Sequence, residues 1–217
     1  MKDGAGKSFE QSYNCQAAVD EETQVIVAGR VTQEPNDKKE LKPSIEKIKA
    51  NMDGKVPDKL SGAAGYFSET NVKVLEEQGI DPYLAAGKQK HGDKPLPASR
   101  GRIPMNATVK ERMARKLRTK NGSKIYAKRK HIVEPVFGQI KEVRGFRRFL
   151  LRGFENVSAE WDMVCLTHNI LKLFRHGTLV ANPNKGDSGH NSLRITCKFI
   201  KNDLLTTGFR RNLLLAC

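Results

Sequence analysis

The sequence predicts a mixed α/β fold built around a single sheet. Residues 13–33 form two apolar, β-branched runs separated by the polar turn DEET, which is the pattern of an antiparallel strand pair. Further along, short apolar runs alternate with amphipathic helical segments, a pattern that favours parallel strands joined by helices. The length of 217 residues and the hydrophobic fraction of 38% suit one domain with one core.

The first half of the chain supplies most of the expected sheet. After the strand pair, residues 38–52 predict a helix, because Leu41, Ile45 and Ile48 recur at helical spacing. The remaining segments are a weak strand, a helix capped by Ser68 or Thr70 and stopped by Gly79, and a short strand, over 59–67, 68–79 and 80–86.

The second half is expected to be helical. Residues 87–104 have no periodicity and predict a flexible loop. Helices are expected over 106–120, 124–150 and 158–175, the last with Ser158 as N-cap. Pro135 is expected either to start the middle helix or to kink it, since proline lacks the backbone N–H.

Three segments of different character are expected along the chain. Residues 1–12 are a short leader, 13–176 the folded domain and 177–217 a divergent tail that we expect to be poorly ordered. The tail mixes turn residues with isolated apolar clusters and has no steady period.

Positive charge is concentrated in one block. Between Arg100 and Arg152 there are 17 Lys and Arg against three Asp and Glu, a local net charge of +14 in a chain of +15. Such a block favours a polyanionic partner, bound through release of counterions from phosphates. The alternative is a basic face that is merely solvated.

No feature points to a membrane or to export. The sequence contains no run of about 18 apolar residues, and residues 1–12 lack the apolar core of a signal peptide. Cys15, Cys165, Cys197 and Cys217 are far apart and form no metal-ligand pattern, so we expect reduced thiols in a cytoplasmic protein.

Two acids could carry chemistry. Asp20 ends an apolar strand, and Glu134 lies on a helix inside the basic block. Converging there, they would suit divalent metal ions acting on a phosphodiester. Lys130 and Lys141 lie at helical spacing from Glu134, so an ordinary i, i+4 ion pair is an equally good reading from spacing alone.

Four stretches of the sequence carry a family resemblance. YNCQAAVDEETQVIVA, GYFSETN, YAKRKHIVEPVFGQIKEVRGFRRFLLRG and EW occur in order over Tyr13–Leu173. Together they resemble the catalytic domain of bacterial insertion-sequence transposases of the DDE type. The resemblance implies a ribonuclease-H-like fold, a mixed sheet flanked by helices, with Mg²⁺ or Mn²⁺ held by two Asp and one Glu. It implies cleavage and strand transfer at the element ends, and action as a homo-oligomer on DNA near the nucleoid.

Transferred residue by residue, the resemblance places the first acid at Asp20 and the third at Glu134. The Tyr, Arg, Glu and Lys of the family signature correspond to Tyr126, Arg129, Glu134 and Lys141, with Lys130 as a substitute for Arg129 because the spacing is one residue longer. Nearby arginines that alternate with phenylalanines are expected either to contact DNA or to pack against the helix; they are Arg144, Arg147 and Arg148.

The second acid is missing. Relatives have Asp two residues before the Gly of the GY motif, whereas SGAAGYFSE places Ala63 there, and a methyl group cannot bind a metal. The short leader makes Met1 resemble an internal start, and the tail resembles a frame-shifted end. We therefore expect a degenerate copy that is inactive or impaired in cleavage, with a non-catalytic DNA-binding protein as the alternative.

Overall fold

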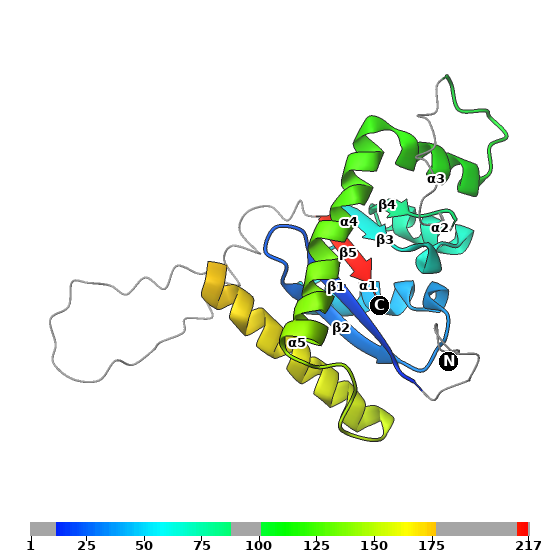
Figure 1. The fold of residues 1–217 in the computed structure, drawn as a ribbon. Coiled ribbons are helices and arrows are strands. Elements are labelled where there is room, and N and C mark those ends of the chain that lie inside the picture. The colour runs from blue at the N-terminus through cyan, green and yellow to red at the C-terminus, as the bar shows by residue number, and fades with distance from the viewer. Residues whose placement is uncertain (1–11, 88–100, 177–211, 217) are drawn as a thin grey trace, which may run out of the picture.

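The computed structural model describes residues 12–87, 101–176 and 212–216 and shows one five-stranded sheet flanked by helices (Figure 1). The strands are ordered β2-β1-β5-β3-β4 across the sheet. Their bounds are Asn14–Asp20 for β1, Ile26–Thr32 for β2, Lys59–Gly62 for β3, Asp81–Leu84 for β4 and Asn212–Ala216 for β5. The expected mixed α/β fold is confirmed.

The first two strands form the expected antiparallel hairpin at one edge of the sheet. The register pairs Asn14 with Thr32 and Val19 with Ile26, with an irregularity between Ala18 and Val19. The turn contains Gln24 at a φ of 58°, a left-handed conformation that is uncommon for a residue other than glycine. Residues far along the chain bond to Gln24: its side-chain amide donates to the His131 carbonyl, and the His168 ring bonds to its backbone carbonyl.

The other half of the sheet is parallel, as the helical connections predicted. β3 pairs with β4 from Lys59 with Asp81 to Gly62 with Leu84. The 3-10 turn Ala64–Tyr66 and α2, Glu69–Glu77, connect them. The side chain of Ser68 accepts a hydrogen bond from the N–H of Asn71, so Ser68 is the N-cap of α2.

The centre of the sheet differs from the expectation. β5 lies between β1 and β3, antiparallel to the first and parallel to the second. Its Leu213 and Leu215 side chains are completely buried. The prediction of a poorly ordered tail is therefore wrong for residues 212–216; residues 177–211 lie outside the described part, as do residues 1–11 and most of the 87–104 segment.

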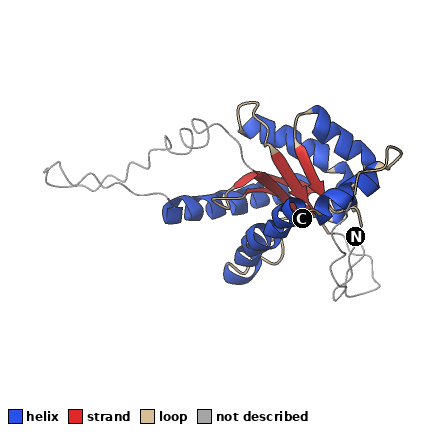
Figure 2. Cartoon of the chain, turned by 90° about the horizontal axis from the view of Figure 1, so that it is seen from above, coloured by secondary structure: helices blue, strands red, loops and turns tan. Residues whose placement is uncertain are grey.

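Helices cover both faces of the sheet (Figure 2). On one face, α1, α2 and α3 enclose a core that includes Leu41, Leu60 and Leu75. On the other, α4 and α5 pack over Val19, Val136 and Trp161. Since successive strand residues point to opposite faces, Ala17 and Val19 belong to the second core and Ala18 to the first.

The helices on the first face have clear starts. The 3-10 turn Asp37–Lys39 precedes α1, Leu41–Asn51, and α3 spans Val109–Arg118. Thr108 and Glu111 form a reciprocal capping box at the start of α3, so two of its terminal N–H groups are bonded.

The helix predicted over 124–150 begins and ends earlier. α4 spans Lys120–Gly138, and a π-helical turn, Gln139–Val143, follows it. The helix continues through Pro135, which neither starts nor ends it. Proline removes the N–H that would bond the carbonyl of His131, and the side-chain amide of Gln24 donates to that carbonyl at 3.2 Å instead.

The last helix also begins earlier than predicted. α5 spans Phe154–His176, directly after Gly153 at a φ of 85°. Ser158 lies inside the first turns, so its predicted role as N-cap is wrong. No helix in the described part of the chain is long and apolar enough to cross a membrane.

Candidate nucleic-acid interface

The basic block folds into a sharp corner between α3 and α4. Thr119 alone separates the two helices, and its hydroxyl accepts from the N–H of Gly122 and donates to the carbonyl of Lys116. Gly122 is required at this corner because a Cβ there would overlap the Lys116 carbonyl oxygen. The corner therefore fixes the direction of α3 relative to α4.

Contacts between Lys116 and the edge strand β4 hold α3 against the sheet. Lys116 forms an ion pair with Asp81, donates to the carbonyl of Pro82 at 2.8 Å and lies 4.3 Å above the ring of Tyr83. Burial, with help from the neighbouring Asp81, raises the pKa of Tyr83 to about 12, so its hydroxyl stays protonated and donates to that carboxylate. Lys116 thus positions the helix and is not available to a ligand.

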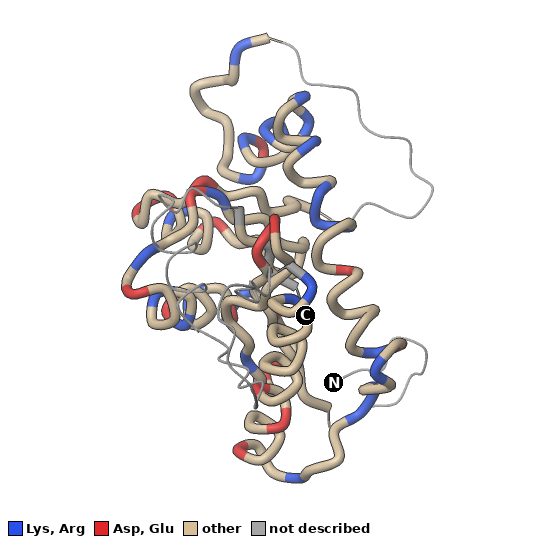
Figure 3. The backbone as a smooth tube through the Cα atoms, turned by 90° about the vertical axis from the view of Figure 1, so that its left-hand side faces the viewer, with Lys and Arg blue, Asp and Glu red and all other residues tan. Residues whose placement is uncertain are grey.

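Other cations on these two helices are not bonded to neighbouring side chains in the described ranges. Five lysines and arginines of α3 and α4 make no ion pair or side-chain hydrogen bond with any residue in the described ranges: Lys110, Arg118, Lys120, Lys124 and Lys130. Figure 3 shows Lys and Arg dominating α3 and its junction with α4. These cations can therefore bind a polyanion without breaking an ion pair within the described part of the protein.

The predicted DNA contacts on α4 lie on this surface. The guanidinium of Arg129 lies 5.6 Å from the centre of the Tyr126 ring. The Arg129 Nε is buried without a hydrogen-bond partner among the described residues. Lys130 is exposed. Tyr126, Arg129 and Lys130 therefore stand next to one another, as their spacing suggested.

The predicted contacts after α4 divide into two kinds. Arg144 donates to the carbonyl of Val164 and to the Thr167 hydroxyl, so it ties the π-helical turn to α5. Arg147 pairs with Glu142. Lys141, above the Phe137 ring at 5.4 Å, and Arg148 are exposed. Lys141 lies inside the π-helical turn, which alters the α-helical spacing expected between Glu134 and Lys141.

Asp20 is part of the β1–β2 turn. Its side chain is 1% exposed, and one carboxylate oxygen accepts from the Thr23 N–H at 2.9 Å and the Thr23 hydroxyl at 2.6 Å. These are the bonds of a turn cap. One oxygen of the carboxylate, Oδ2, is therefore already engaged by its own turn.

Ala63 lies at the other end of the sheet. It directly follows β3, whose Gly62 is level with Leu215 of β5 and so with Ala18 of β1. Asp20 is level with Leu60 through Leu213. Three residues along the strand and two strand spacings across give about 14 Å between Asp20 and Ala63. The sheet does not bring these two positions together.

Glu134 is exposed on α4, between the buried Val133 and Val136. The preceding turn of α4 rests on the β1–β2 turn, because Lys128 pairs with Glu21 and His131 accepts from Gln24. Glu134 is thus nearer in the fold to the turn of Asp20 than the sequence separation implies. The Asp20 carboxylate, however, is buried within that turn.

No group of three His, Cys, Asp or Glu side chains in the described part of the chain could hold a metal ion. The two metal ions of a cleaving site lie about 4 Å apart and need several oxygen ligands around them. Ala63 supplies none, and Asp20 is buried at the far end of the sheet. These residues do not fit a two-metal site.

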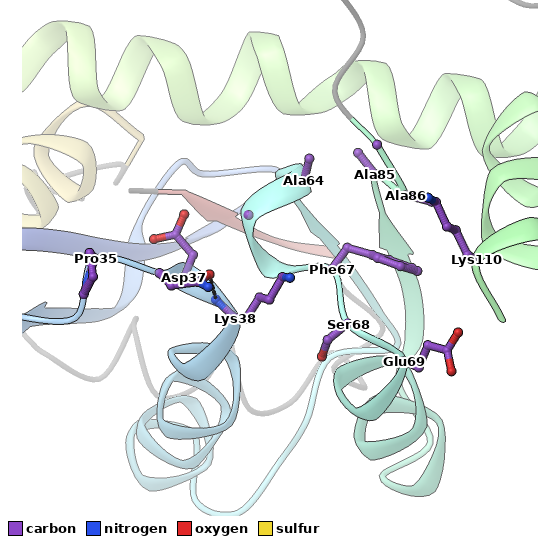
Figure 4. Close-up of a pocket in the computed structure, with 13 residues that line it drawn as sticks. Pro35, Asp37, Lys38, Ala64, Phe67, Ser68, Glu69, Ala85, Ala86 and Lys110 are labelled. Atoms are coloured by element: carbon purple, nitrogen blue, oxygen red, sulfur yellow. Dashed lines mark hydrogen bonds between the residues drawn. The ribbon is translucent and has the colours of Figure 1, made fainter. Parts of the chain in front are cut away.

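A cleft of about 660 Å³ opens beside Ala63, at the carboxyl ends of β3 and β4 (Figure 4). Its walls include Ala64 and Gly65, Ala85 to Gly87, and Lys110 from α3. The Asp37 carboxylate in the wall accepts from the amides of Asn14 and Gln16. Carboxyl ends of parallel strands are a common place for ligands in α/β sheets.

The chain belongs to the transposase DDE domain family, whose model matches residues 2–170. Its general function is therefore that of a transposase, a class that recombines DNA and uses divalent metal ions. No curated protein and no solved structure matches this chain. The matched residues include β1 to β4 but not β5.

The candidate surface includes four cations that are not among the predicted DNA contacts: Lys110, Arg118, Lys120 and Lys124. The segment VKERMARKLR carries five cations in ten residues. The density of cations in this segment indicates a basic helix. The sequence does not show, however, that the corner at Thr119 places this helix next to α4, which carries Tyr126, Arg129 and Glu134.

Proposed function

We propose that this chain is a ribonuclease-H-like transposase domain that binds DNA through the α3–α4 surface and is impaired in metal-dependent cleavage. The observation that carries the proposal is the group of uncommitted cations at the corner. Their positive charge is not neutralised by neighbouring acids, so it is available for phosphates.

The ribonuclease-H-like assignment is supported by the mixed sheet and by helices on both faces. An antiparallel hairpin and a parallel pair share one sheet, and a long helix that carries Glu134 crosses it. The transposase family match covers the hairpin, the parallel pair and this helix.

The identity and the positions of the expected metal-binding residues support impaired cleavage. Position 63, beside the cleft, carries a methyl group, and Asp20 lies about 14 Å away at the other end of the sheet. A metal bound by one exposed carboxylate such as Glu134 would lack the shared ligands that neutralise two dications. Mg²⁺ or Mn²⁺ would supply nucleophile activation and charge neutralisation in an intact relative, whereas no group of three potential ligands in the described ranges of this chain could hold them.

Binding of DNA is tested by fluorescence anisotropy with a labelled duplex over a series of salt concentrations. Lys120→Ala/Lys124→Ala removes two cations of the corner, and we expect the slope of log K against log salt to become shallower by about 1.8. The matched control, Lys42→Ala/Lys73→Ala, removes the same charge from exposed sites on α1 and α2. Equal effects of the two double variants would contradict a localised interface.

Cleavage is tested with a nicked-plasmid assay and element-end duplexes in Mg²⁺ or Mn²⁺. We expect no metal-dependent nicking by the natural chain. We also expect none from Ala63→Asp alone, because Asp20 would remain distant from the restored acid. Robust nicking by the natural chain would overturn the proposed impairment while leaving the DNA interface intact.

A further inference from the structure

The loop of residues 144–153, which joins the π-helical turn to α5, divides its apolar side chains between two directions. Phe146 and Phe149 are partly buried against the core on the α4–α5 face of the sheet, and their rings meet edge to face at 5.5 Å between centres. Leu150 and Leu151, in contrast, are 77% and 51% exposed. The phenylalanines therefore anchor the loop, and two adjacent leucines extend from it into solvent.

The exposed leucines are held in place through their backbone. The carboxylate of Glu160, on α5, accepts the N–H groups of Leu150 and Leu151 at 3.0 to 3.1 Å. The ring of Phe149, directly before them, lies 6.1 Å from the ring of Tyr13, next to β1. Two side chains on a backbone fixed in this way lose less conformational freedom when a partner covers them than they would on a flexible loop.

Positive charge surrounds the leucine pair. Residues 144–153 contain four arginines and no acid. Two of these arginines are bonded to neighbouring residues, as described above. Arg148 and Arg152, on either side of the leucines in the sequence, are exposed and make no ion pair or side-chain hydrogen bond with any residue that the structure describes. A partner of this surface must carry negative charge and also offer an apolar space for two leucines.

Duplex DNA has both features, since phosphates run along its strands and apolar base faces are stacked between them. Proteins that bend DNA insert leucine or similar side chains between neighbouring bases from the minor groove. A narrow minor groove has an enhanced negative potential, which attracts arginine. The leucine pair follows the last turns of α4, whereas the α3–α4 corner precedes its first turn, so 19 residues of helix separate the two surfaces.

We propose that Leu150 and Leu151 form a wedge that enters the minor groove of duplex DNA, unstacks a base step and bends the duplex, while Arg148 and Arg152 hold the flanking phosphates. This inference rests on the proposed function, because it takes DNA as the partner of the chain. It adds a second contact, which acts by deforming the DNA. Unstacking is easier where base pairing is already disturbed, so the wedge predicts a preference for mismatched duplexes.

The first test compares the affinity of the full chain for two labelled duplexes of equal length, one fully paired and one with a central tandem mismatch, by fluorescence anisotropy. We expect the natural chain to bind the mismatched duplex about tenfold more tightly. Leu150→Ser/Leu151→Ser should bind the two duplexes equally. Met163→Ser/Leu166→Ser, the matched control, removes side chains that are 60% and 53% exposed on α5 and should keep the preference.

The charged residues are tested on the same two duplexes. Arg148→Gln/Arg152→Gln should make the slope of log K against log salt shallower by about 1.8, because two phosphate contacts are lost. Lys120→Ala/Lys124→Ala, at the α3–α4 corner, should weaken binding of both duplexes by the same factor and keep the preference between them. Loss of preference therefore reports on the wedge, and loss of general affinity reports on the corner.

Bending is measured by resonance energy transfer between dyes at the two ends of a mismatched duplex of about 20 base pairs. At saturating protein, the natural chain should raise the transfer efficiency, because a bend brings the duplex ends closer. Leu150→Ser/Leu151→Ser, at a concentration that also saturates the duplex, should leave the efficiency near that of free DNA.

Four results would overturn the wedge. A natural chain that binds both duplexes equally, without bending them, would remove the wedge and leave the DNA interface, whereas a chain that binds neither duplex would remove both. A melting temperature of Leu150→Ser/Leu151→Ser well below that of the natural chain would show that the protein itself covers the leucines. Loss of binding to phosphatidylserine–phosphatidylcholine vesicles in this variant, with the duplex preference unchanged, would assign the surface to a membrane.

Discussion

At the β1–β2 turn, the carboxylate of Asp20 accepts both the N–H and the hydroxyl of Thr23. A turn cap and a metal ligand make opposite predictions for Asp20→Asn. As a cap, its replacement lowers the free energy of unfolding by about 1–3 kcal/mol, and millimolar Mg²⁺ changes the melting temperature of neither protein. Differential scanning fluorimetry with and without Mg²⁺ measures both effects.

Glu69→Gln, at an exposed acid of α2, is the matched control for loss of one charge. It should leave stability nearly unchanged. Stabilisation of the natural chain by Mg²⁺ that disappears in Asp20→Asn would show instead that the turn carboxylate binds the metal.

His168 gives the protein a dependence on pH. Burial lowers its pKa below the ordinary 6.5, with further lowering by Lys172 and Arg144, although the bond to the Gln24 carbonyl acts in the opposite sense. The Nδ1 atom is buried without a partner among the described residues, so protonation there is unfavourable. A lowered folded pKa means that stability is present above pH 6.5 and is lost as pH falls toward the folded pKa.

We therefore expect the free energy of unfolding in urea to fall as pH is lowered from about 7 to 5. His168→Asn should flatten that decline, whereas His131→Asn, at an exposed histidine, should retain it. An unchanged decline in His168→Asn would assign the pH dependence to other groups.

At the scale of elements, the corner between α3 and α4 depends on Gly122. Gly122→Ala drives a methyl group into the carbonyl of Lys116, a backbone atom that can move only if α3 moves. We expect a loss of about 1–3 kcal/mol in urea unfolding, together with weaker DNA binding because α3 is displaced. Gly138→Ala is the control, since nothing lies within 4 Å of a Cβ built there; similar losses in both would contradict this role.

The path of α4 shows what a sequence can and cannot predict about elements. The strand pair before and after Asp20 and the cap at Ser68 were predictable, because turn residues and local periodicity carry them. Continuation through Pro135 was not, since it depends on Gln24, 111 positions earlier, donating to the His131 carbonyl. The roles of Asp20 and Arg144 depend likewise on partners that only folding brings close.

The same lesson applies to the candidate site. The cations were predictable from composition, and Ala63 from its motif. That Asp20 and Ala63 lie at opposite ends of the sheet was not, because the register runs through β5, a segment outside the recognised motif.

At the scale of the whole molecule, β5 joins the two halves of the sheet. The β1–β2 hairpin and the β3–β4 pair are both bonded to it. Leu215→Asp buries a charge in the core between them, so we expect a loss of about 3–5 kcal/mol or complete unfolding. Leu150→Asp, at a leucine that is 77% exposed, should be tolerated; circular dichroism during thermal unfolding distinguishes them, and equal stability would show that β5 does not hold the sheet together.

The central position of β5 also sets an order of events during synthesis. The ribosome completes β3 at Gly62 but reaches Asn212 only 150 residues later. At about 5–20 residues per second, the inner edges of β1 and β3 wait roughly 8–30 s for the strand that pairs with both. During that interval, each nascent chain presents two open strand edges to its neighbours on the same messenger RNA, so slow translation of this gene would favour aggregation before folding.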